Sequence, residues 1–297
     1  MCEVGLILNP SAGNGQLKEN IDLITDKLTT KFESFNVYIT SRPGDGAKYI
    51  RQISSEVDLI IGAGGDGTIY ELINAICKLN ERPKFAIIPG GTCNDFSRAV
   101  SMSQDPFQAL DQILEGKEEK VDVGHANDQY FLNFWGIGLI TQVSENIESD
   151  KKETLGRLSY YMSAIHTVKE AIPFNLTLTS NKMNYNGEAV MVIVGNGPFT
   201  GGLKAFFPKN SIQDGMFDVL ILKGTSVPTF WSILKSSIFN KDLFNKEEIV
   251  HFQTNELTIS CNPQQQIDCD GEHNYKTPTK LTVLPKHLTM IVAEYIE

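Results

Sequence analysis

The sequence predicts two domains of different class, an N-terminal open α/β domain and a C-terminal antiparallel β-sandwich-like domain. The chain has 297 residues, a length that accommodates about two domains of ordinary size. As far as residue 120, short apolar runs alternate with helical periodicity, a pattern typical of parallel strands joined by helices. Beyond that point short strands follow one another across turns, which indicates antiparallel pairing. We therefore place the domains at residues 1–120 and 121–287, and we expect the tail, residues 288–297, to return to the first domain.

The composition excludes several classes of protein. Hydrophobic residues make up 41% and charged residues 21% of the chain, as in an ordinary soluble globular protein. The net charge of −10 argues against nucleic acid as the main partner, and it means that contact with an anionic membrane needs a local patch. No apolar run approaches the ~18–20 residues that span a bilayer, and no basic leader opens the sequence, so we expect a cytoplasmic protein. The five cysteines are odd in number and lack CxxC spacing, which predicts neither a zinc site nor a disulfide framework.

The first element is an apolar strand at residues 4–8, which runs into the polar turn NPSAGNG at residues 9–15. Apolar residues then recur at the spacing of one helix face: Leu17, Ile21, Ile24 and Leu28. A corner between a strand and a helix can present backbone N–H groups to a phosphate, although it can equally be a plain connecting loop.

The next strands of the first domain also end in turn residues. A strand at residues 36–40 leads into the turn at 42–46 and a short helix whose apolar residues are Ala47, Ile50 and Ile53. A strand at residues 85–88 ends in a segment rich in glycine and polar residues, 89–98. Because ligands of open α/β sheets bind outside the carboxyl ends of the strands, we expect the site of this domain at that edge.

The corner at residues 57–76 carries the most specific local pattern. A buried strand at residues 58–61 ends in a glycine-rich turn that contains Asp66, and a helix with an apolar face follows. The spacing Gly62-x-Gly64-x-x-Gly67 also satisfies the dinucleotide fingerprint, but that site needs an acidic residue at the tip of the next strand, and residues 85–88 run into Pro89 without one. A carboxylate inside a phosphate cradle is repulsive unless a divalent cation lies between the two anions, so this corner favours a magnesium nucleotide over NAD.

Five motifs follow one another along the chain: NPSAG at 9–13, GGDGT at 64–68, PGGTCNDFSR at 89–98, DGMFD at 214–218 and DGE at 270–272. In this combination the sequence resembles the diacylglycerol kinase-like lipid kinases of bacterial type, a family that includes sphingosine and ceramide kinases. The resemblance implies an active site in the cleft between the two domains, with ATP and Mg²⁺. It implies transfer of the γ-phosphate to a lipid hydroxyl, with diacylglycerol as the expected acceptor and phosphatidic acid as the product. A lipid partner met at the inner face of the membrane is implied as well, and a homodimer is allowed.

By this resemblance the nucleotide lies against the first three motifs and two further positions. The residues implied are Asn9, Pro10, Ser11, Ala12, Gly13, Thr40, Gly64, Gly65, Asp66, Gly67, Thr68, Glu71, Thr92 and Asn94. The chain departs from the pattern at Asn14, where many members carry a basic residue, and Lys18 one helical turn later is the substitute that the sequence offers.

The resemblance also implies the residues that carry the reaction. Glu272 is the expected general base for the lipid hydroxyl, with Asp270 assisting, because a hydroxyl must lose its proton as it attacks the γ-phosphorus. Asp66 is the rival for the base and is otherwise expected to organise magnesium and the γ-phosphate. On the acceptor side the resemblance implies Asp95, Arg98 and Lys152. Lys152 either reaches toward the transferred phosphate or is only a solvated lysine at the start of a helix.

A structural magnesium ion is implied at the DGMFD motif. Asp214 is the expected main ligand, and Ser211 and Met216 contribute backbone oxygens. Asp218 is expected to contact these ligands rather than the ion. Coordination by oxygen alone suits Mg²⁺. Read without the family, Asp214-Gly215 is simply a turn before a strand.

Two other functions remain open from the sequence. One is a kinase that acts on a soluble acceptor such as NAD, because NAD kinases share the GGDGT motif. The other is a lipid-binding or regulatory protein without catalytic activity. This alternative stays open because Asn14 stands where many family members carry a basic residue. The phosphate-binding lysine motif of P-loop enzymes is absent from the sequence, so that chemistry is excluded.

Overall fold

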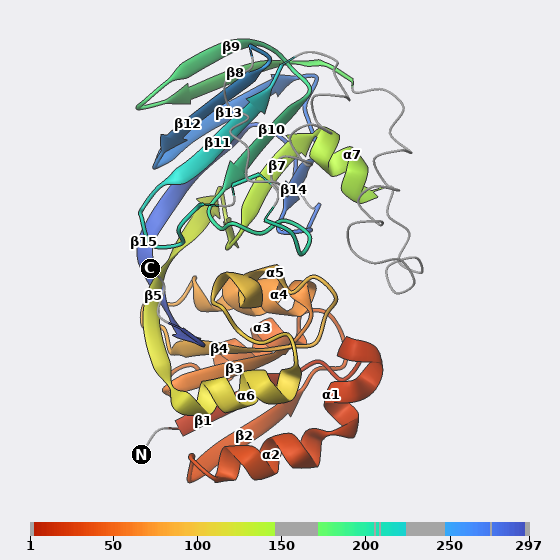
Figure 1. Ribbon diagram of the computed structural model, residues 1–297, viewed down its shortest axis with the longest axis vertical. Coiled ribbons are helices and arrows are strands. Elements are labelled where there is room, and N and C mark those ends of the chain that lie inside the picture. Colours follow the sequence, from red (N-terminus) through yellow and green to blue (C-terminus); the bar gives the residue numbers. More distant parts are fainter. Residues whose placement is uncertain are drawn as a thin grey trace. The chain divides into compact units, whose positions relative to one another are not determined.

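The computed structural model describes residues 3–145, 172–204, 206–207, 209–223, 247–273 and 275–294. Helical periodicity predicts two helices, at about residues 155–168 and 227–239; these segments and Lys152 lie outside this part of the chain. Its contacts divide the chain into two compact units, Met1–Val123 with Pro285–Glu297, and Gly124–Leu284 (Figure 1). We refer to them as the first and the second unit.

The first unit contains a parallel sheet in the order β2-β1-β3-β4. Its strands are β1 (Glu3–Leu8), β2 (Ser34–Ile39), β3 (Leu59–Gly64) and β4 (Lys84–Pro89). The three inner strands are apolar and almost wholly buried, as expected where both faces of a parallel sheet are covered, whereas the edge strand β2 is partly exposed.

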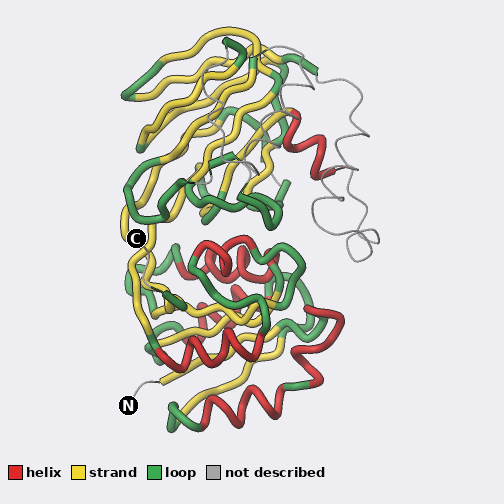
Figure 2. Tube along the Cα trace, in the orientation of Figure 1, coloured by secondary structure: helices red, strands yellow, loops and turns green. Residues whose placement is uncertain are grey.

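Helices connect these strands. In the second unit, the residues described there contain one helix, α7 (Leu139–Glu145; Figure 2). Those of the first unit are η1 (Ala12–Gly15), α1 (Gln16–Glu19), α2 (Ile21–Thr29), α3 (Asp45–Ile53), α4 (Asp66–Ile76), α5 (Asp95–Ala99) and α6 (Pro106–Glu115). Leu17, Ile24 and Leu28 are buried as their spacing predicts, but the single helix expected there is divided at Asn20, which has non-helical backbone angles.

The second unit contains two antiparallel arrangements of strands, which confirms the predicted β-sandwich-like class. One sheet has the order β12-β11-β10-β7-β14, formed by β12 (Ile249–Thr254), β11 (Phe217–Leu222), β10 (Met191–Gly195), β7 (Phe134–Gly138) and β14 (Ile267–Cys269). In the other, β13 (Glu256–Asn262) pairs with β8 (Phe174–Ser180), which pairs with β9 (Asn184–Ala189). Alternating burial along β8 and β13 shows that one face of this sheet is covered.

Two strands continue from one unit into the other. β5 (Lys117–Ala126) pairs with β6 (Gln129–Phe131) across the turn predicted at residues 126–128. β15 (Thr279–Val292) pairs with β13 at its start, and near its end Met290 lies opposite Phe85 of β4 in the first unit.

One pairing differs from the sequence prediction. The apolar run at residues 188–194 predicts one strand, preceded by a turn at residues 181–187; in the structure this strand is divided at Val190, and β9 lies mostly in residues 181–187. β9 is a polar edge strand with the sequence NYNGEA, so it lacks the apolar alternation that predicts a strand.

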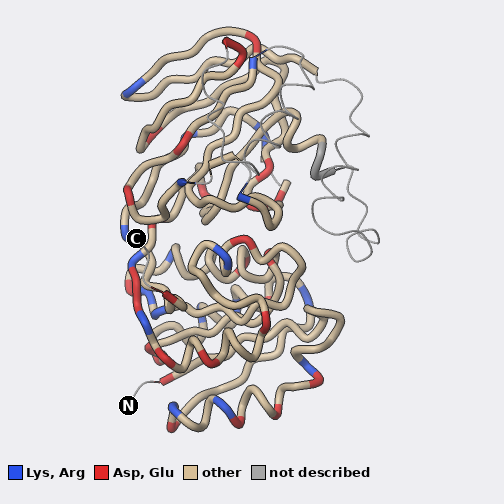
Figure 3. The backbone as a smooth tube through the Cα atoms, viewed as in Figure 1, with Lys and Arg blue, Asp and Glu red and all other residues tan. Residues whose placement is uncertain are grey.

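Charged residues of both signs are mixed along the chain of the first unit (Figure 3). Lys27 of α2 pairs with Asp111 of α6, and Lys84 of β4 pairs with Glu118 of β5, each at 2.5 Å. Such exposed pairs contribute little to stability, and the buried strands remain the main source of it.

Candidate active site

The loops that follow β1, β3 and β4 lie against one another at the carboxyl edge of the parallel sheet. The Asn9 N–H donates to the carbonyl oxygen of Ala63 at 2.9 Å, and the Asn9 amide donates to Thr68 Oγ1 at 2.9 Å. The Gly90 N–H donates to the carbonyl oxygen of Gly64 at 2.8 Å. The NPSAG, GGDGT and PGGTCNDFSR motifs, separated in the sequence, are therefore joined by direct hydrogen bonds.

Glycine is required where these loops meet. A Cβ at Gly91 would lie 2.9 Å from the Cα of Gly65 and 2.7 Å from Asn94 Oδ1, closer than side chains approach. Gly13 has φ +60°, a left-handed conformation that favours glycine, and it lies against the carbonyl of Gly90. The loops thus meet through backbone, the arrangement that leaves N–H groups able to face an anion.

Asp66 joins the GGDGT loop to the start of α5. Its Oδ2 accepts the N–H of Asn94 and its Oδ1 accepts the N–H of Asp95, both at 2.8 Å. Asn94 is buried with φ +49°, and its side chain bonds both the N–H and the carbonyl of Gly91 at 2.8 Å. Both carboxylate oxygens of Asp66 are engaged, and each retains lone-pair capacity for a further donor or a hydrated cation.

The remaining predicted positions of these loops have local roles. The Ser11 N–H donates to Asn9 Oδ1 at 3.0 Å, and Arg98 Nε donates to the carbonyl of Cys93 at 2.7 Å. Thr92 is exposed, and the Thr40 N–H donates to the carbonyl of Leu8 at 2.9 Å, which holds the end of β2 beside the end of β1.

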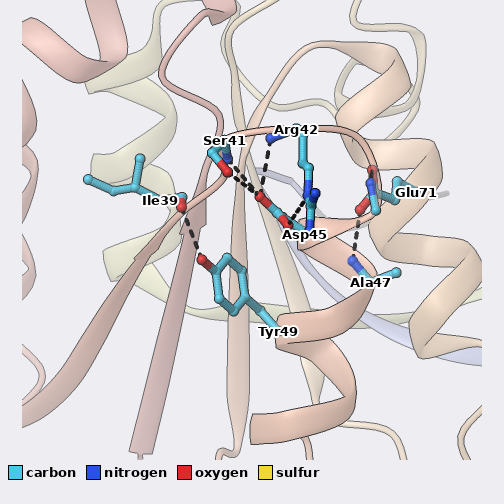
Figure 4. Close-up of polar contacts among 8 residues, drawn as sticks. Ile39, Ser41, Arg42, Asp45, Ala47, Tyr49 and Glu71 are labelled. Atoms are coloured by element: carbon cyan, nitrogen blue, oxygen red, sulfur yellow. Dashed lines mark hydrogen bonds and ion pairs between the residues drawn. The ribbon is translucent and has the colours of Figure 1, made fainter.

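Two carboxylates hold the turn between β2 and α3 (Figure 4). Asp45 Oδ2 accepts hydrogen bonds from the hydroxyl and the N–H of Ser41, at 2.6 and 2.9 Å, and from the N–H of Arg42 at 3.1 Å. The hydrogen bonds from Ser41 are the largest cause that lowers the pKa of Asp45 to about 2. The turn is thus tied together by an ionised side chain of its own.

Glu71 of α4, which is not part of the turn, binds the same turn (Figure 4). Its Oε2 accepts the N–H of Gly44 at 3.0 Å and its Oε1 accepts the N–H of Ala47 at 2.8 Å. These are donors at the start of α3, where the helix leaves N–H groups unsatisfied and the helix dipole favours an anion. Glu71, predicted to lie at the nucleotide, thereby orders the loop that follows Thr40.

The DGE motif of the second unit is a tight hairpin turn. Cys269 and Glu272 exchange backbone hydrogen bonds of 3.0 Å in both directions. Asp270 and Gly271 between them have φ of +50° and +91°, the positive angles of a two-residue hairpin turn, for which Asp-Gly is a preferred pair. Glu272 is therefore the first residue after a well-defined turn.

The Asp270 carboxylate is half-buried and bonded to three consecutive backbone amides. The N–H groups of Leu132, Asn133 and Phe134 donate to its oxygens at 2.6, 3.1 and 2.8 Å. Burial, with a smaller contribution from the charge of Asp268, raises the pKa of Asp270 to about 7 against the lowering effect of the three amides. Asp270 fastens the turn to the segment between β6 and β7.

Sequence reasoning found no partner for His273, and the structure provides one. His273 Nε2 lies 3.2 Å from Oδ2 of Asp268, whose side chain is 2% exposed. The signal that could have identified Asp268 is a single acidic residue inside the short strand 266–269, where burial is expected.

The segment predicted to hold magnesium forms a turn before β11. The Met216 N–H donates to Asp214 Oδ1 at 2.9 Å, and the Gln213 N–H donates to Ser211 Oγ at 3.3 Å. Asp218 lies within β11, where His251 Nε2 lies 2.6 Å from its Oδ1 and the Gln253 amide donates to its Oδ2.

The donor chemistry of this segment fits a hard cation better than a transition metal. Within the ranges of the chain that the structure describes, no three His, Cys, Asp or Glu side chains converge as a metal cluster. One carboxylate with backbone oxygens and water is a set that suits Mg²⁺ and not zinc. Because Asp218 is paired with His251, a direct bond from Asp218 to such an ion would compete with that pair.

The raised pKa of Asp270 predicts a pH dependence of stability. Between its ordinary value of 3.8 and about 7 the folded protein binds a proton that the unfolded chain releases, so this contribution is complete at low pH and is lost as pH rises through about 7. Asp270→Asn removes this titration. We expect the wild type to lose stability relative to the variant as pH rises from about 4 to about 7, measured by urea denaturation at a series of pH values. A difference that is constant across this range would contradict the assignment.

Comparison with known proteins agrees with this geometry. Residues 3–126 match the family model described as "Diacylglycerol kinase catalytic domain", and residues 136–292 match the "YegS C-terminal NAD kinase beta sandwich-like domain". The "Putative lipid kinase SAS0691" of Staphylococcus aureus strain MSSA476 is 31% identical over 295 residues, covering 96% of this chain and 95% of the relative. The "Putative lipid kinase SH2167" of Staphylococcus haemolyticus strain JCSC1435 is 32% identical, with 96% and 94% covered.

A solved structure described as a diacylglycerol kinase from Bacillus anthracis strain Sterne has a TM-score of 0.86 and 40% identity, covering 98% of this chain and 96% of its own. A second crystal structure from the same strain has a TM-score of 0.87 at the same identity, with 98% and 97% covered. The two family models match the two parts of the chain in turn, and the solved structures share the fold over 98% of it. The chain belongs to the family of bacterial diacylglycerol kinase-like lipid kinases.

Proposed function

We propose that this protein transfers the γ-phosphate of ATP, with Mg²⁺, to the hydroxyl of a lipid, and that diacylglycerol is the acceptor and phosphatidic acid the product. The observation that supports this most directly is the joining of three motif loops at one edge of the parallel sheet, with Asp66 bonded to the amides of Asn94 and Asp95. Such an edge offers N–H groups to phosphates beside a carboxylate that can face a hydrated cation.

Each group of residues has a part in this proposal. The NPSAG, GGDGT and PGGT loops bind the phosphates through backbone, and Asp66 faces the magnesium ion of the nucleotide. Magnesium neutralises charge on the phosphoryl oxygens when it is bound. Asp95 and Arg98 face the acceptor, and Lys152, outside the described residues, contributes a cation to the transferred phosphate. Asp214, with backbone oxygens of Ser211 and Met216, holds a second, structural magnesium ion.

Glu272 is the general base in this proposal. As the lipid oxygen forms its bond to the γ-phosphorus, the bond from phosphorus to the bridging oxygen of ADP breaks and the hydroxyl proton passes to the Glu272 carboxylate. Asp270 assists by holding the turn, because both of its oxygens already accept backbone N–H groups.

The lipid acceptor requires the protein to visit a membrane surface. The helices of the described part of the chain include none that is long and apolar enough to cross a bilayer. We therefore propose peripheral contact, through a local patch that overcomes the net charge of −10.

Transfer of labelled γ-phosphate from ATP into a chloroform-extractable product tests this function. With Mg²⁺ and mixed micelles of diacylglycerol and a sphingoid base, we expect labelled phosphatidic acid from the wild type. We expect Glu272→Gln to lower kcat by roughly 10²–10⁴-fold, the usual contribution of a general base. Asp66→Asn should also lower activity, since an amide cannot accept both N–H groups of Asn94 and Asp95.

Two results would overturn the proposal in different ways. ATP binding without any labelled lipid would reject diacylglycerol and point to a soluble acceptor or a regulatory role. Absence of ATP binding would reject the nucleotide site itself.

The contacts of Glu71 predict a selective effect on ATP. Glu71→Gln keeps the size of the side chain but has one carbonyl oxygen for the N–H groups of Gly44 and Ala47. Leaving one donor unsatisfied costs about 1–3 kcal/mol, so we expect the KM for ATP to rise about tenfold or more while kcat changes little. Steady-state kinetics measure this, with Glu118→Gln, an exposed ion-paired carboxylate of the same unit, as the matched control. An unchanged KM for ATP would show that the turn before α3 does not shape the nucleotide site.

A further inference from the structure

Asp268 is a buried carboxylate that the proposed reaction does not use. It lies in β14, two residues before the turn of the DGE motif, and its side chain is 2% exposed. Its Oδ1 accepts the N–H of Gly271 at 2.8 Å, and its Oδ2 lies 3.2 Å from His273 Nε2. Burying a carboxylate is costly unless it is paired and hydrogen-bonded, so a position that needed only packing would favour an apolar residue.

The register of the hairpin places Asp268 and Glu272 on opposite faces. Cys269 and Glu272 pair with each other across the turn, Asp268 precedes Cys269 in β14, and His273, which follows Glu272, contacts Asp268. Neighbouring side chains of a strand point to opposite faces, and directly opposite residues share a face. Asp268 and His273 thus occupy one face of the turn, and Cys269 and Glu272 occupy the other.

The partner of Asp268 on the neighbouring strand has no side chain. Asp268 lies opposite Gly136 of β7, so β7 contributes no side chain directly beside the carboxylate. Two contacts of the carboxylate are directed toward the turn, one to the amide of Gly271 and one to the ring of His273.

Among the described residues, the side chains of Asp270, Gln266 and Asp268 anchor the turn that carries Glu272. Asp270 bonds the amides of residues 132–134, Gln266 donates to the carbonyls of His273 and Tyr275, and Asp268 bonds Gly271 and His273. Of these, Asp268 is the one that bonds residues on both sides of Glu272, namely the residue before it and the residue after it.

We infer that Asp268, together with His273, is a positioning pair that fixes the turn from the face opposite to Glu272 and so holds the Glu272 carboxylate in its productive orientation. This inference rests on the proposed role of Glu272 as general base. A displacement of a catalytic group by about 1 Å can reduce turnover about 10²-fold, so a loosened turn should act on kcat.

Three variants test this inference. Asp268→Ala removes both contacts, and we expect kcat to fall about 10²-fold with the KM for MgATP unchanged. Asp268→Asn keeps an oxygen for the Gly271 N–H, and we expect it to retain most of the wild-type kcat. Asp122→Ala is the matched control, since Asp122 is a buried carboxylate that accepts the N–H of Lys286 at 2.7 Å. We expect this control to lower the melting temperature without lowering kcat.

Amide hydrogen exchange at Gly271 gives a second readout that does not depend on activity. We expect fast exchange in Asp268→Ala and protection in Asp268→Asn and the wild type. If Asp268→Ala lowers the melting temperature as Asp122→Ala does but keeps the wild-type kcat, the positioning role is overturned. If the wild type phosphorylates no lipid, the proposed function fails separately, and equal Gly271 exchange in all variants would then overturn the anchoring by Asp268 itself.

Discussion

The bond between the Asp66 carboxylate and the amides of Asn94 and Asp95 is the constraint on which the nucleotide edge depends. It joins the end of β3 to the start of α5 and so fixes the distance between two glycine loops that contact each other through backbone. A carboxylate is suited to this work because it accepts two N–H groups at once, and charge-assisted hydrogen bonds are stronger than neutral ones. Asn9, through Thr68, adds the loop after β1 to the same arrangement.

Other carboxylates order loops in the same way, by accepting hydrogen bonds from backbone N–H groups. Glu71 binds two amides at the start of α3, Asp45 binds its own turn, and Asp270 binds three amides between β6 and β7. Several carboxylates of the family motifs therefore act on the protein backbone as well as, in our proposal, on substrate or metal. The consequence is that loss of activity in a carboxylate variant does not by itself distinguish a chemical role from a positioning role.

Much of the architecture was predictable because its signals are local. The inner strands are apolar runs, α2 shows Ile24 and Leu28 on its buried face, and the glycine motifs mark the strand ends. β9 was missed because a polar edge strand needs no apolar face, and the division at Asn20 was missed because helical periodicity continues across it. Motif spacing predicts the site residues as a set, whereas it does not encode which atoms each side chain contacts.

The sequence by itself determined the two fold classes, the alternation of strands and helices in the first domain and the presence of the five motifs, since each depends on local periodicity or on residues within a few positions of one another. Only the tertiary structure decided that Asp66 reaches the amides of residues 94 and 95, that Glu71 reaches the turn before α3, and that Asp270 reaches residues 132–134. It also paired Asp268 with His273, two residues that the sequence leaves without an evident relation. These contacts depend on strand register and on the packing of distant segments, which local periodicity does not encode.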